Sequence, residues 1–144
     1  MPETISSASE LPEPLPSEAR PCIVVGYSAR PEGRAALERA VSEARLRSAA
    51  LVVVNTSPED AEAAGLVDQL AASGLQYEIR IAADAHGSAE ELLRIAETTA
   101  ADFIVIGLRR RSPVGKLLLG SNAQRVLLDA ACPVLAVKAE PDVI

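Results

Sequence analysis

The stretch at residues 103–137 reads FIVIGLRRRSPVGKLLLGSNAQRVLLDAACPVLAV and contains three local patterns. It begins with a short apolar run at residues 103–106, which is typical of a buried strand. Residues 122–131 carry apolar side chains at helical spacing, and residues 133–137 form a second apolar run. The connection at residues 107–121 is longer than the few residues that a turn between strand and helix needs. We therefore predict a strand, a long functional loop, a helix and a strand.

The rest of the chain alternates between the same two patterns. Apolar runs at residues 22–27 and 51–54 are typical of strands covered on both faces, whereas residues 76–81 alternate apolar and charged side chains, as a strand at a sheet edge does. Segments with helical periodicity separate these strands. The pattern predicts one doubly wound α/β domain, with a five-stranded parallel sheet in the order 3-2-1-4-5 and helices on both faces. Side chains expected to point inward from two of the helices are Leu66, Val67, Leu70, Val126, Leu127 and Ala130.

The ends of the chain fall outside this pattern. Residues 1–20 are rich in proline, serine and glutamate, so we expect a disordered acidic tail before a domain at residues 21–139, with a short C-terminal tail at 140–144. The first tail lacks the basic and apolar regions of a secretion signal, and no apolar run approaches the length of a bilayer span. We therefore expect a cytoplasmic protein with no membrane partner.

The composition excludes further classes of protein. A net charge of −6 and only three aromatic residues argue against nucleic-acid binding, which needs basic side chains for phosphates and often aromatic rings for bases. Cys22 and Cys132 begin apolar runs and are expected to be small buried hydrophobic residues without a disulfide or a metal. His86 has no carboxylate, serine or cysteine at a telling distance along the chain, so we predict no catalytic role for it.

The predicted sheet also indicates where a ligand would bind. In doubly wound sheets, ligands bind beyond the carboxyl ends of the strands, where the winding reverses. Ser28 follows the first strand, Asn55 follows the second, and residues 107–121 follow the fourth. Helix N-termini meet at the same edge, and they favour phosphate or carboxylate groups. A nucleotide or a phosphorylated metabolite is the expected ligand.

Residues 22–37, 101–107 and 115–137 together resemble the universal stress protein family, in its first strand and helix, its fourth strand, and its last helix and strand. The resemblance covers residues 21–139. It implies a flavodoxin-like domain of the adenine nucleotide alpha hydrolase type. It also implies a cytoplasmic homodimer that acts in the stress response and is not an enzyme.

The ATP-binding branch of that family has a glycine, two residues, a glycine, nine residues, and a glycine followed by Ser or Thr. Gly107, Gly120 and Ser121 occupy the outer positions with this spacing, while Arg110 replaces the middle glycine. Ser28 replaces an aspartate that lies near the nucleotide in that branch. An arginine obstructs close approach of the backbone to phosphates, but its guanidinium can also bind phosphate oxygens directly.

Each of these residues has a structural interpretation beside the functional one. Gly120, Ser121 and Asn122 form either a phosphate seat or only a turn and a helix cap, and Ser121 with Gln124 has the capping-box pattern. Ser28 is expected near the cap of the first helix. Asn55 stands where the family contacts adenine through backbone, a role that any residue can fill. The basic residues that are either an anion clamp or solvated charges are Arg109, Arg110, Arg111 and Lys116.

Two functions remain open. The first is a regulatory protein that binds ATP or AMP, with magnesium accompanying ATP; the residues expected to bind the nucleotide are Ser28, Asn55, Gly107, Arg110, Gly120, Ser121 and Asn122. The second is an interaction protein with a vestigial pocket and no cofactor, which the replacements at Ser28 and Arg110 favour. A weak ATPase is a third hypothesis, for which the sequence offers no base and no metal ligand.

The last predicted strand, at residues 133–137, is entirely apolar although it would lie at a sheet edge. An exposed apolar edge promotes aggregation unless it is covered or paired. In the family that the sequence resembles, the fifth strand mediates a dimer. We therefore expect Val134, Leu135 and Val137 in a two-fold interface.

Overall fold

A computed structural model describes residues 21–56, 63–82, 88–110, 117–118 and 120–139. Both expected tails, His86, Arg111 and Lys116 lie outside these ranges. In chain order, the elements are β1 (Cys22–Tyr27), α1 (Pro31–Arg47), β2 (Ala50–Asn55), α2 (Ala63–Ser73), β3 (Tyr77–Ile81), α3 (Ser88–Thr98), β4 (Phe103–Arg110), β5 (Leu117–Leu118), α4 (Ser121–Asp129) and β6 (Val134–Lys138).

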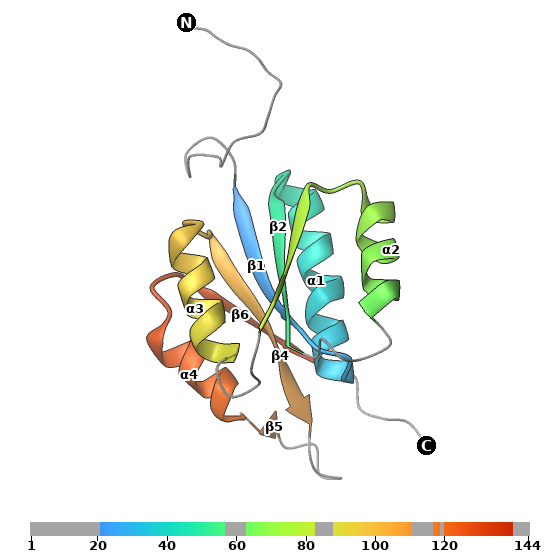
Figure 1. Ribbon diagram of the computed structural model, residues 1–144. Coiled ribbons are helices and arrows are strands. Elements are labelled where there is room, and N and C mark those ends of the chain that lie inside the picture. The colour runs from blue at the N-terminus through green and yellow to red at the C-terminus, as the bar shows by residue number, and fades with distance from the viewer. Residues whose placement is uncertain (1–20, 57–62, 83–87, 111–116, 119, 140–144) are drawn as a thin grey trace, which may run out of the picture.

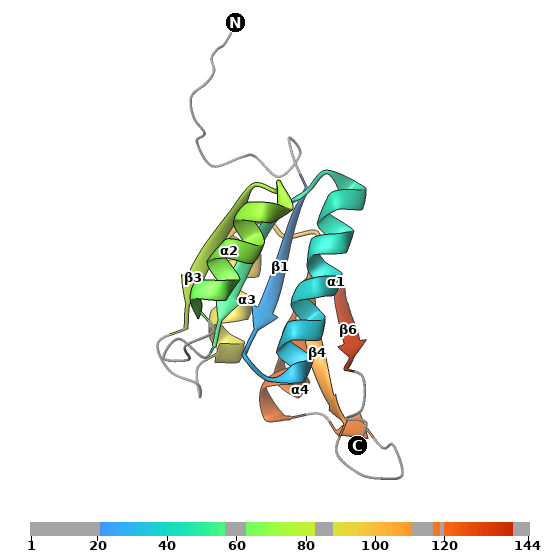
Figure 2. The same ribbon diagram turned by 90° about the vertical axis from the view of Figure 1, so that its right-hand side faces the viewer.

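Five parallel strands form the main sheet, in the order β3-β2-β1-β4-β6. This order confirms the predicted 3-2-1-4-5 arrangement, with β6 as the fifth parallel strand. At the centre of the sheet, Val25 pairs with Val53 on one side and with Val105 on the other. Helices α1 and α2 cover one face, and α3 and α4 cover the opposite face (Figures 1 and 2). The predicted doubly wound α/β domain is therefore present.

The core consists of two aliphatic layers, one on each face of the sheet. Successive side chains of a strand point to opposite faces, so Ile23 and Val25 belong to the layer under α1 and α2, while Val24 belongs to the layer under α3 and α4. All three side chains are fully buried. Burial of this aliphatic surface drives the folding of both layers, since apolar area removed from water is the dominant favourable contribution.

The segment after Ile106 differs from the predicted loop. Strand β4 continues to Arg110 because Gly107 and Leu108 still pair with β6, and β5 then pairs antiparallel with the end of β4. Part of the expected loop is thus a small hairpin. The sequence pattern did not predict it, because β5 has only two residues, which are too few to show the alternation of a strand.

Two predicted inward-facing side chains are instead exposed. Val67 on α2 and Leu127 on α4 both lie at the edge of their helix's buried face, and neighbouring residues fill the contact with the sheet. Helix α4 also ends at Asp129, earlier than predicted, because Ala130 adopts an extended backbone conformation.

The two cysteines are free, and both are only half-buried, whereas the sequence predicted buried side chains. Burial raises the pKa of the Cys22 thiol, and the nearby carboxylate of Asp102 raises it further, although a hydrogen bond with Thr99 opposes the shift. Burial also raises the pKa of Cys132. Both thiols are therefore protonated at neutral pH and weakly nucleophilic. Within the described ranges, no helix is long and apolar enough to cross a membrane.

Candidate functional site

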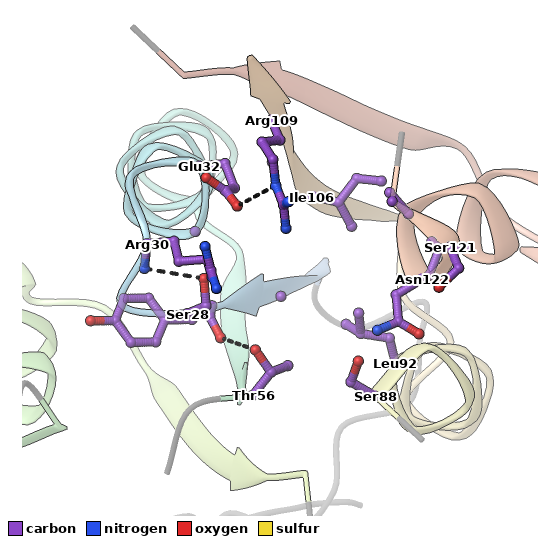
Figure 3. Close-up of a pocket in the computed structure, with 17 residues that line it drawn as sticks. Ser28, Arg30, Glu32, Thr56, Ser88, Leu92, Ile106, Arg109, Ser121 and Asn122 are labelled. Carbon is purple, nitrogen blue, oxygen red and sulfur yellow. Dashed lines mark hydrogen bonds and ion pairs between the residues drawn. The ribbon is translucent and has the colours of Figure 1, made fainter. Parts of the chain in front are cut away.

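A cavity of about 540 Å³ lies beyond the carboxyl ends of β1 and β4, between the first turns of α1 and α4 (Figure 3). This is the position that the winding of the sheet predicted. Its lining residues are Gly26, Tyr27, Ser28, Arg30, Glu32, Gly33, Thr56, Ser88, Leu92, Ile106, Gly107, Arg109, Gly120, Ser121, Asn122, Ala123 and Val126. Apolar side chains from α3 and α4 form part of the wall, and hydroxyl and charged groups surround the rest.

The structure brings most of the predicted site residues together. The predicted residues that line the cavity are Ser28, Gly107, Gly120, Ser121 and Asn122. Asn55 does not line it: its side chain is 3% exposed, and the next residue, Thr56, faces the cavity in its place. Arg110 ends β4 and pairs with Leu117, and its side chain lies outside the described part of the molecule.

Hydrogen bonds order the turn between β1 and α1. The backbone N–H of Arg30 donates to Ser28 Oγ at 3.3 Å, which places the serine just before the helix, as predicted. Thr56 donates from its backbone N–H and from Oγ1 to the carbonyl oxygen of Tyr27, each at 2.9 Å. The ends of β1 and β2 are thereby held together at the floor of the cavity.

Two glycines let α1 approach the sheet closely. A Cβ on Gly33 would lie 2.3 Å from Ser28 Oγ, and a Cβ on Gly107 would lie 2.0 Å from the carbonyl oxygen of Glu32. The first turn of α1 therefore rests directly on β4, and a side chain at either position would push it away. This contact brings Glu32 to the cavity wall, where its Oε2 lies 3.6 Å from Arg109 Nε.

The opposite wall is the N-terminus of α4. Gly120 occupies the N-cap position and its carbonyl accepts the N–H of Gln124 at 2.9 Å, while no side chain caps this end. The predicted capping box at Ser121 and Gln124 is therefore wrong, because the helix begins one residue earlier and Ser121 is its first residue. Ser121 and Asn122 lie on this wall, facing the cavity (Figure 3). The positive end of the helix dipole points the same way and favours an anion.

Comparisons with known proteins agree with this architecture. Residues 59–138 match the model of the universal stress protein family. A universal stress protein of Mycolicibacterium smegmatis is 47% identical over 128 residues, which cover 81% of this chain and 96% of the relative. The chain belongs to the universal stress protein family. The resemblance seen in the sequence is therefore confirmed.

Solved structures of universal stress proteins share the fold. The protein of Archaeoglobus fulgidus in complex with dAMP has a TM-score of 0.59 and 24% identity, covering 83% of this chain and 98% of that chain. A universal stress protein in complex with cAMP has a TM-score of 0.62 and 22% identity, covering 84% of this chain and 98% of that chain. Both similarities support the α/β fold described above.

Several residues that line the cavity of this universal stress protein were not expected from the sequence. Ser88 and Leu92 enter the cavity from α3, which carried no site prediction. Arg30 and Glu32 follow Ser28 so closely that their place near the site could have been inferred. Thr56 could not be chosen over Asn55, because the sequence does not show which of two neighbours at a strand end turns inward.

The described residues offer little for metal chemistry. They contain no group of three or more His, Cys, Asp or Glu side chains that could hold a metal ion. The cavity instead combines hydroxyl groups, helix N-termini and three charged side chains. Such a set can bind and orient an anionic ligand of moderate size.

Proposed function

We propose that this universal stress protein is a regulatory module that binds an adenine nucleotide in the cavity between α1 and α4. The convergence of Gly107 from β4 with Gly120 and Ser121 from the N-terminus of α4 on one cavity is the observation that carries the proposal. These residues have the spacing of the family's ATP-binding motif. Relatives of the same fold have been solved with dAMP and with cAMP, which supports an adenine nucleotide as the ligand class.

The cavity offers a place for each part of such a ligand. The phosphate would accept hydrogen bonds at the first turn of α4 and from the Ser121 hydroxyl. The apolar side chains of Leu92 and Val126 would contact the base or sugar, and Ser28 and Thr56 would supply hydroxyl groups on the other side. In this proposal, the nucleotide is a bound effector rather than a substrate, and magnesium accompanies ATP only.

Calorimetric titration with AMP and with ATP, with and without magnesium, tests this function. Ser121→Ala should weaken binding roughly tenfold, because a hydrogen bond to a charged group contributes about 1.5 kcal/mol. Ser42→Ala is the matched control, since Ser42 is exposed on α1 outside the cavity lining and should bind like the unmodified protein. Absence of both heat and thermal stabilisation at millimolar nucleotide would refute the proposal.

Arg110 favours a second candidate, an interaction protein whose pocket no longer binds nucleotide. Arg110 occupies the glycine position of the motif, and Ser28 occupies an aspartate position. Titration of Arg110→Gly separates the two functions. If the variant binds nucleotide and the unmodified protein does not, then the arginine closes the site.

We also propose that the protein is a cytoplasmic homodimer that pairs through β6. This strand lies at one edge of the parallel sheet, where it pairs with β4. Val134, Leu135 and Val137 are half-buried, so part of their apolar surface remains available to a second copy.

A further inference from the structure

The charged side chains that line the cavity are unevenly paired. Among the described lining residues they are Arg30, Glu32 and Arg109. Glu32 Oε2 lies 3.6 Å from Arg109 Nε, and the two side chains face each other on the α1 side of the cavity (Figure 3). No ion pair joins the Arg30 guanidinium to another residue in the described ranges.

The position of Glu32 is set by the backbone. The residue lies in the first turn of α1, where the helix dipole favours a negative charge. Its carbonyl oxygen is in contact with Gly107, so the turn cannot move without disturbing β4. The side chain is 18% exposed, which limits screening of its charge by water, whereas Arg109 is 44% exposed.

Glu32 therefore occupies the N-terminus of α1, one of the places in the cavity that would attract an anion. Its carboxylate already interacts with the positive end of α1 and with Arg109. The N-terminus of α4 and Arg30 remain for a ligand, and one phosphate needs only one such place. Each additional phosphate brings a further negative charge near this fixed carboxylate, so the repulsion from Glu32 increases with the charge of the ligand.

We infer that Glu32 is a specificity-determining residue that makes the cavity select adenine nucleotides with one phosphate, such as cyclic AMP or AMP, over ATP. The inference rests on the proposed nucleotide-binding function and specifies its ligand class. Selection by charge predicts a graded order of affinity, with cyclic AMP and AMP ahead of free ATP. Magnesium should reduce the penalty for ATP because it neutralises part of the triphosphate charge.

The test compares ligands of different charge on three variants. Calorimetric titrations use cyclic AMP, AMP and ATP, in EDTA so that ATP keeps its full charge, at low salt and at 0.5 M NaCl. Glu32→Gln removes the charge and keeps the shape. Glu32→Asp keeps the charge, and Glu38→Gln removes a charge from an exposed position of α1 outside the cavity lining.

For Glu32→Gln at low salt, we expect ATP affinity to rise at least tenfold and cyclic AMP affinity to change less than threefold. The gain for ATP should shrink at 0.5 M NaCl. Glu32→Asp and Glu38→Gln should keep the selectivity of the unmodified protein. Circular dichroism melting of each variant verifies that it is folded.

Four results would overturn the inference. An equal gain for all three nucleotides, or no change in Glu32→Gln, would show that the carboxylate does not discriminate by charge, while binding of AMP would leave the proposed function intact. A loss of affinity for every nucleotide in Glu32→Gln would show that Glu32 contacts the ligand directly. If no nucleotide binds to the unmodified protein or to any variant, the proposed function fails together with the inference.

Discussion

At the scale of single residues, Gly107 and Gly120 differ sharply in the space around them. A Cβ on Gly107 would meet the carbonyl oxygen of Glu32 at 2.0 Å, whereas a Cβ on Gly120 would meet nothing within 4 Å. Gly107→Ala should therefore displace the first turn of α1 and lower the free energy of unfolding by about 3 kcal/mol, near the upper end for overpacked sites. Urea denaturation monitored by circular dichroism measures this loss.

Gly120→Ala provides the control for that measurement. The backbone φ of −66° at Gly120 suits any L-residue. The free energy of unfolding of the Gly120→Ala variant should therefore stay within about 0.5 kcal/mol of that of the unmodified protein. Similar losses in both variants would mean that the packing of α1 on β4 is not what requires a glycine at position 107.

The sequence predicted much of the cavity lining, because both the motif spacing and the ends of the strands can be recognised along the chain. Gly107, Gly120 and Ser121 meet at the cavity as expected. The pairing of Glu32 with Arg109 was not predictable, since it depends on a backbone contact between two segments far apart in the chain. The sequence also gives no sign of how closely a helix will approach a strand.

At the scale of elements, α4 is attached to the core by little apolar contact. Val126 is the only fully buried side chain of this helix, with 1% exposure, and Leu128 is 74% exposed. Val126→Ala should cost about 2 kcal/mol of unfolding free energy, because it removes buried methyl groups and leaves a cavity. Leu128→Ala should change it by less than about 0.5 kcal/mol. Thermal melting of both variants tests the difference. Equal losses of stability in the two variants would contradict the packing of α4 on the core through Val126.

The element boundaries show where periodicity stops being informative. Strands β1, β2 and β3 were predicted within a residue because each has a continuous or alternating pattern. The hairpin of β4 and β5 was missed, since its pairing depends on contacts across the chain and not on a local pattern. Val67 and Leu127 were wrongly assigned inward because an apolar residue at the border of a helix face satisfies the periodicity without being buried.

At the scale of the whole molecule, β3 and β6 form the two edges of the parallel sheet, and the proposed dimer pairs through β6. Val137→Lys should convert the dimer to a monomer, because it places a charge in the apolar interface. Ile81→Lys is the control at the β3 edge, where Ile81 is already 60% exposed. Sedimentation velocity at micromolar concentration distinguishes the states, with circular dichroism as the folding control. A monomeric unmodified protein, or dissociation only of Ile81→Lys, would contradict the proposed interface.

The strand order of the whole sheet was predictable because right-handed crossovers and strict alternation leave few arrangements. The distribution of the core between two faces followed for the same reason. The lining of the cavity was less predictable, since it depends on which side chains of five different elements converge.

The cavity lies between helices that belong to different core layers. Helix α1 packs with one layer and α4 with the other, on opposite faces of the sheet (Figure 2). A nucleotide in contact with both first turns would act as a non-covalent cross-link across the sheet. Since α4 has so little buried contact of its own, the bound ligand would restrain the fluctuations of this helix more than those of α1. Ligand binding in the cavity would then reduce the mobility of the exposed surface of α4, and a partner would recognise this difference without any change in the average fold.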